Sequence, residues 1–113
     1  MQCILRQPDK NMPANPPTEI NIGGRTIAIR IDPKLESWGE YHGDDAEIVL
    51  AARTLAKQSS LRETLRHEML HAALDIAGLS YLERFEEEAV VRCIENIFHP
   101  AWEKVRKSLT ILE

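Results

Sequence analysis

Cysteine is scarce in this chain of 113 residues, which contains only Cys3 and Cys93. The two lie far apart and neither belongs to a CxxC pair, so neither stands at a spacing typical of a metal ligand. We expect two free thiols rather than a disulfide. Cys93 falls among apolar residues of a predicted helix, and we therefore expect it to be a small residue of the core.

The chain also lacks a long apolar run, a signal peptide and a basic stripe. No apolar segment approaches the ~20 residues of a membrane span, and the first residues carry no apolar region typical of a signal peptide. Lysine and arginine are scattered among acidic residues at a net charge of −4, so nothing neutralises a phosphate backbone. We expect a cytoplasmic, single-domain protein that binds neither membrane nor nucleic acid.

The most informative segment is His67-Glu68-Met69-Leu70-His71. Residues i and i+4 lie one above the other on a helix, so His67 and His71 can direct ring nitrogens at one metal ion. Glu68 lies about 100° round the helix from His67, beside the metal rather than on it. Zinc lowers the pKa of a bound water to about 7, and a nearby carboxylate can accept its proton. The motif therefore predicts hydrolysis assisted by Zn²⁺, with Glu68 as the general base.

The residues around this motif predict a helix over about 61–77. Ser60 followed by Glu63 is the pattern of a capping box, and Gly78 stands where a left-handed residue ends a helix. Apolar residues recur at helical spacing and predict a second, buried face. They are Met69, Leu70, Ala73, Leu74 and Ala77.

The residues before the helix predict a small sheet. Isoleucines alternate on both sides of Gly23-Gly24, which predicts a β-hairpin over 20–31 with one buried face. A loop then leads to a third strand at about 46–51. Residues 1–18 contain four prolines and predict an extended leader, so we expect the domain to span 19–113.

A second helix is predicted to start near Leu82, followed by a shorter helix over about 101–109. His99-Pro100 interrupts or kinks the helical pattern, because proline disfavours helical conformation in the residue before it. The apolar residues of the second helix are Phe85, Ala89, Val90, Cys93, Ile94 and Ile97. Strands followed by helices, without alternation, predict an α+β fold.

The predicted zinc site needs a third protein ligand, because catalytic zinc usually has three and keeps one position for water. The pattern HExxHxxGxxH is excluded, since Leu74 and Ala77 stand where it has Gly and His. The remaining common solution is a Glu from the next helix, where Glu86, Glu87 and Glu88 are candidates. Glu86 projects nearest to the predicted apolar face and Glu88 further from it, so geometry alone does not select Glu88.

The arrangement resembles the gluzincins, HExxH metallopeptidases whose third ligand is a Glu on a following helix, often before Ala, as in Glu88-Ala89. Over about 19–98, HEMLHAALDIAGL followed by EEEAVVRCI looks like the minimal HExxH proteins of phages and prophages, which are distantly similar to the ImmA/IrrE type. The resemblance implies a zincin-like fold and a zinc metallopeptidase with His67, His71 and Glu88 as ligands. It also implies that a sheet edge beside the active helix binds a peptide or protein substrate in extended form.

Other residues are candidates for supporting roles. Asp75, one turn beyond His71, is a candidate to hydrogen-bond a ligand imidazole. Tyr41, His42, Tyr81 and Arg92 are candidates to stabilise an oxyanion. Two alternatives to an enzyme stay open: a metal-stabilised protein-interaction module of phage or prophage origin, and a metal-free helical domain. Neither the substrate nor the oligomeric state follows from the sequence.

Overall fold

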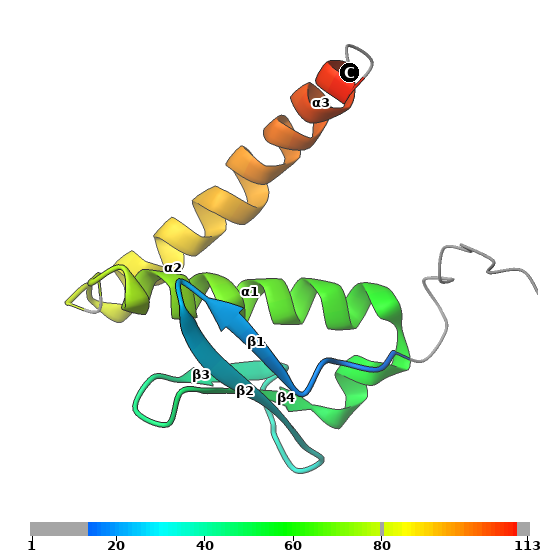
Figure 1. The fold of residues 1–113 in the computed structure, drawn as a ribbon, viewed down its shortest axis with the longest axis vertical. Coiled ribbons are helices and arrows are strands. Elements are labelled where there is room, and N and C mark those ends of the chain that lie inside the picture. The colour runs from blue at the N-terminus through cyan, green and yellow to red at the C-terminus, as the bar shows by residue number, and fades with distance from the viewer. Residues whose placement is uncertain (1–13, 80, 111–113) are drawn as a thin grey trace, which may run out of the picture.

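The computed structural model describes residues 14–79 and 81–110. It is an α+β structure in which a four-stranded sheet packs against one long helix, and a further helix runs away from this layer (Figure 1). The elements are β1 Glu19–Ile22, β2 Arg25–Asp32, β3 Gly39–His42, β4 Glu47–Ala51, a 3₁₀ turn at Ala52–Ala56, α1 Gln58–Ile76, α2 Arg84–Cys93, a π turn at Ile94–Phe98 and α3 His99–Thr110. None of the described helices combines the length and apolarity needed to cross a membrane.

The predicted hairpin is confirmed. β1 and β2 pair antiparallel with Ile20 opposite Ile27. Gly23 and Gly24 have φ angles of 57° and 86°, and two successive positive φ angles are what a two-residue type I′ turn requires. The isoleucines consequently share one face of the hairpin, which is the face turned toward the core.

The sheet has the order β1-β2-β4-β3 and is mixed, because β2 pairs with β4 in parallel while the other pairs are antiparallel. The third predicted strand is confirmed as β4. The segment expected to be a loop before it contains an additional strand, β3, which forms one edge of the sheet. β3 has four residues and no apolar alternation, so its extended form depends on pairing with β4.

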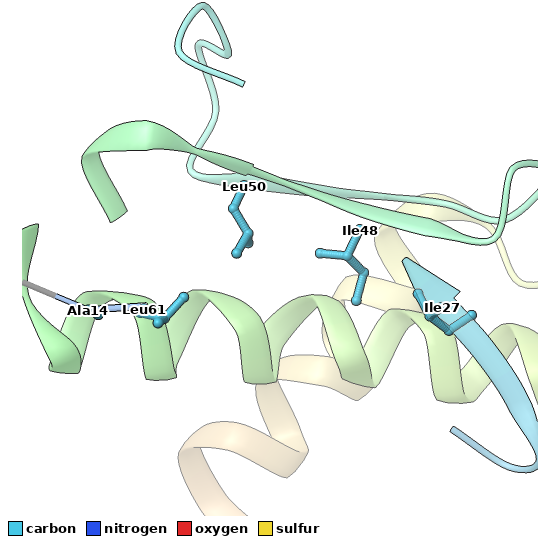
Figure 2. Close-up of a cluster of buried hydrophobic side chains, with 5 residues drawn as sticks. All are labelled: Ala14, Ile27, Ile48, Leu50 and Leu61. Carbon is cyan, nitrogen blue, oxygen red and sulfur yellow. The ribbon is translucent and has the colours of Figure 1, made fainter. Parts of the chain in front are cut away.

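The core lies between the sheet and α1. Ile48 and Leu50 of β4 point toward the helix, where Leu61 packs with them, and Ile27 joins from β2 (Figure 2). These side chains are almost completely buried. The stripe of α1 in contact with this cluster continues through Leu65, Met69 and Ile76. This stripe only partly matches the predicted buried face of the helix, since Ala77, which was predicted to lie on that face, is exposed.

The segment before β1 is packed on the domain rather than separate from it. Ala14 is buried in the core, and its backbone N–H donates to the carbonyl of Leu55 at 2.8 Å. The carbonyl of Thr18 accepts from the N–H of Ile29 at 2.9 Å. The packed unit therefore includes residues 14–18, which were predicted to belong to a leader. The rest of that predicted leader, with Cys3, lies outside the described residues.

The two predicted ends of the α1 helix have different outcomes. The capping box is wrong, because α1 starts at Gln58 and both Ser60 and Glu63 lie inside it. The C-terminal prediction is confirmed: Gly78 has a φ of 86° and donates its N–H to the carbonyl of Asp75 at 3.0 Å. Leu79 donates to the carbonyl of Leu74 at 2.9 Å, which completes a Schellman motif.

His99-Pro100 does not end the second helix. Helical structure continues from Arg84 to Thr110 through the π turn, where the His99 N–H bonds to the carbonyl of Ile94. Pro100 has no N–H to donate and its ring crowds the carbonyl one turn earlier. The wider turn directly before Pro100 accommodates the ring, so the helix changes its winding instead of stopping.

The predicted apolar face of α2 is wrong, and so is the expected burial of Cys93. Ala89, Cys93 and Ile97 are exposed, whereas Val91 is completely buried. Glu87 of α2 and Glu95 of the π turn contact imidazoles of α1, and Val91, which lies one turn from each of them, is turned inward on the same side. Cys93 is therefore a free, exposed thiol.

Candidate metal centre

α1 places both histidines of the motif on the side of the helix that faces α2. His67 and His71 are one turn apart, and their Nε2 atoms lie only 3.3 Å from each other. The two rings meet edge to face, with their centroids 4.9 Å apart. Both side chains are partly shielded from solvent. The arrangement follows directly from the i, i+4 spacing on an unbroken helix.

Glu88 of α2 completes a group of three ligating atoms. Its Oε1 lies 2.9 Å from His71 Nε2, and its Oε2 lies 3.9 Å from His67 Nε2. One atom from each of these three residues lies within 4.8 Å of the others. The motif predicted His67 and His71 as zinc ligands, and the gluzincin resemblance implied Glu88 as the third.

The other two predicted candidates lie elsewhere. Glu87 contacts the opposite nitrogen of one imidazole, His71 Nδ1. Glu86 is exposed and accepts the backbone N–H of Glu83 at 3.0 Å, where it caps the start of α2. Of the three acids, Glu88 is therefore the one that meets both histidine Nε2 atoms.

Glu95, which the sequence interpretation missed, occupies the matching position on the other imidazole. Its Oε1 lies 2.9 Å from His67 Nδ1. Glu95 follows Glu88 by seven residues, or two helical turns on the same face. A search for further carboxylates at this spacing from the predicted ligand would have found it.

These contacts make the centre fit a cation. A neutral imidazole has one donor nitrogen and one acceptor nitrogen, and an ionised carboxylate is only an acceptor. When Nδ1 of His67 and of His71 donates to its carboxylate, both Nε2 atoms become acceptors. These two acceptors face each other and the oxygens of Glu88. Nitrogen and carboxylate donors in this number suit Zn²⁺.

Glu68 lies beside the centre and is buried, with 7% of its surface exposed. Burial raises the pKa of its carboxyl group, and the neighbouring His67 and His71 oppose this shift. The strand β3 lies unusually close here: a Cβ on Gly39 would stand 2.9 Å from Thr64 Cγ2 and 3.2 Å from Glu68 Cγ. Glycine at this position lets the edge strand approach the carboxylate.

Two clefts meet at the centre, and both are lined by Gly39, His67 and Glu68. One has a volume of about 660 Å³ and extends past Trp38. The other has a volume of about 550 Å³ and extends past Arg84. A chain-like ligand laid along them would pass directly over Glu68.

No protein-family model, curated protein or solved structure matches this chain.

The predicted role of Asp75 is wrong. Asp75 accepts a hydrogen bond from the Tyr41 hydroxyl at 2.6 Å, and Glu87 takes the position beside His71 that was expected for it. Burial, together with this bond, raises the pKa of Tyr41 to about 12. Tyr41 lines the second cleft, but its hydroxyl is held by Asp75.

The other candidates for an oxyanion donor are either exposed or already in contact with another side chain. Tyr81 and Arg92 are exposed and line neither cleft. His42 lines the second cleft, but its Nε2 lies 2.9 Å from Glu40 Oε1. Each candidate would have to leave its present position before it could act as a donor at the centre.

A second group of possible metal ligands, His42, Asp45 and Glu47, lies at the turn between β3 and β4. Here the groups already have partners. Arg30 Nη2 lies 3.1 Å from Glu47 Oε1, and His42 is held by Glu40. The guanidinium charge opposes a second cation, so this group suits a metal less well than the one on α1 and α2.

Proposed function

We propose that this protein is a zinc-dependent metallopeptidase of gluzincin type. We also propose that it has a zincin-like fold and is related to the minimal HExxH proteins of phages and prophages. One observation carries the proposal. Three acceptor atoms from His67, His71 and Glu88 converge beside the buried carboxylate of Glu68. A structural zinc site needs a fourth protein ligand, whereas a catalytic one has three and an open position.

In the proposed reaction, His67, His71 and Glu88 hold Zn²⁺. The bound ion supplies Lewis acidity, which polarises a carbonyl and lowers the pKa of water. Glu68 accepts a proton from the attacking water and passes it to the amide nitrogen that leaves.

The edge strand β3 supports the proposed substrate class. Among the described residues, β3 pairs only with β4, and it lies against α1 at Gly39. An edge strand can pair with an extended peptide by β-strand addition, although here the Gly39 carbonyl accepts from Ser37 Oγ at 3.4 Å and would have to exchange this partner. A peptide in this position would run through both clefts and past Glu68. This supports a peptide or protein substrate.

The first test is zinc content together with hydrolysis of fluorescein-labelled casein. We expect about one zinc per chain in untagged wild-type protein. Glu68→Gln should keep the zinc and lower hydrolysis by 10²–10⁴-fold, because it removes the general base and no ligand. His71→Ala should lose both. Glu103→Gln, a matched charge change on α3, should affect neither.

Two results would contradict the proposal. Hydrolysis that survives Glu68→Gln would refute the mechanism, and failure of the folded wild type to retain zinc would refute the metal centre. A protein that retains zinc but does not hydrolyse the labelled casein would favour the alternative, a metal-stabilised interaction module. One observation supports that alternative: Phe98 at the end of the π turn and Trp102, Val105 and Leu109 of α3 recur at helical spacing and are exposed.

A further inference from the structure

The continuous helical segment Arg84–Phe98 supplies the three carboxylates that contact the ring nitrogens of the imidazole pair. Glu88, Val91 and Glu95 follow one another at intervals of three and four residues and so share one face. Val91 between the two acids is completely buried, and α2 contacts α1. Glu95 lies in the π turn Ile94–Phe98, and such turns are frequent at functional sites.

Glu87 and Glu95 touch only the outer nitrogens of the pair. Glu87 reaches His71 Nδ1 and Glu95 reaches His67 Nδ1, while Glu88 reaches the inner Nε2 atoms. Their side chains are 24% and 16% exposed, so both have given up part of their hydration to make these contacts. A carboxylate gives up hydration at a cost that only a strong partner offsets.

We infer that Glu87 and Glu95 are positioning residues, each of which keeps one imidazole proton on Nδ1 and aims the Nε2 lone pair at the cation. The inference rests on the proposed metal centre and adds two residues to it. A carboxylate bonded to Nδ1–H fixes the orientation of the ring and raises its basicity, and removal of such a partner typically weakens metal binding 10–100-fold. One helix would thus deliver a ligand and both groups that orient the other ligands.

The test measures zinc affinity by competition with a chromophoric chelator. We expect Glu87→Gln and Glu95→Gln each to raise the zinc Kd 10–100-fold, because the amide carries no charge to hold the Nδ1 proton. Glu103→Gln on the same continuous helix should leave the Kd unchanged. If either Gln variant fails to fold, as judged by circular dichroism, Asp at the same position tests the contact, since it keeps the charge and shortens the reach.

A second readout separates positioning from a general effect on stability. In long-range ¹H–¹⁵N spectra of the zinc-loaded protein, Glu95→Gln should speed solvent exchange of the Nδ1 proton of His67 but not of His71. Glu87→Gln should do the reverse. If both variants bind zinc within threefold of wild type and keep both protons, the inference is overturned while the metal centre stands. A wild-type protein that binds no zinc would overturn the metal centre first, and the inference with it.

Discussion

Substitution of Gly39 by alanine tests whether the close approach of β3 to α1 is as tight as the structure indicates. An added Cβ would stand 2.9 Å from Thr64 Cγ2, 3.2 Å from Glu68 Cγ and 3.3 Å from Leu50 Cδ2. Carbon atoms pack best at about 3.5–4.0 Å, so the strand or Thr64 must shift. Overpacking of this kind costs about 1–3 kcal/mol. Alanine also lowers the conformational entropy of the unfolded chain, which offsets about 0.4–1 kcal/mol of this cost.

We therefore expect Gly39→Ala to lower the free energy of unfolding by about 1–2 kcal/mol, or Tm by roughly 4–15 °C. Thr64→Ser removes Thr64 Cγ2, which is the nearest atom. The double variant should therefore recover part of the lost free energy of unfolding. The coupling between the two sites should exceed about 0.5 kcal/mol. Urea unfolding followed by circular dichroism in excess EDTA gives all four free energies without a contribution from metal binding. A stable Gly39→Ala protein, or strictly additive costs, would refute the reasoning.

Two further predictions concern Tyr41 and Gly78. In a Tyr81→Phe background Tyr41 is the only tyrosine, and phenolate absorbance should report its pKa of about 12. Asp75→Asn should lower that pKa, and an unchanged titration would contradict the hydrogen bond. Because the unfolded reference is about 10, this contribution to stability is complete below pH 10 and is lost as the pH rises toward 12. Gly78→Ala should cost about 1–2 kcal/mol in urea unfolding, since the φ of 86° is strained for alanine although space is free; a neutral result would count against this.

The hairpin and the C-terminal end of α1 could be predicted because their signals are local. Alternating isoleucines around Gly23-Gly24 define a turn and a buried face within a few residues. Gly78 ends α1 by its own backbone freedom. The strand β3 could not be predicted in this way, because its four residues become extended only when β4 lies beside them.

The choice among Glu86, Glu87 and Glu88 is the clearest case of tertiary control. The apolar spacing of α2 pointed to a face that includes Ala89 and Cys93, and both are exposed. What turns the helix is its polar contact with the imidazoles of α1, and that partner is absent from any local pattern in α2. The same rotation brings Glu95 to the centre.

The sequence by itself determined the pairing of His67 with His71 and the place of Glu68 beside them. The relative positions of these side chains are set by one turn of a single helix, and the residues between them are compatible with helical structure. Only the tertiary structure decided which carboxylates meet these side chains. That contact depends on how two helices rotate against each other, and the rotation minimises the combined cost of buried charge and exposed apolar surface over both helices at once.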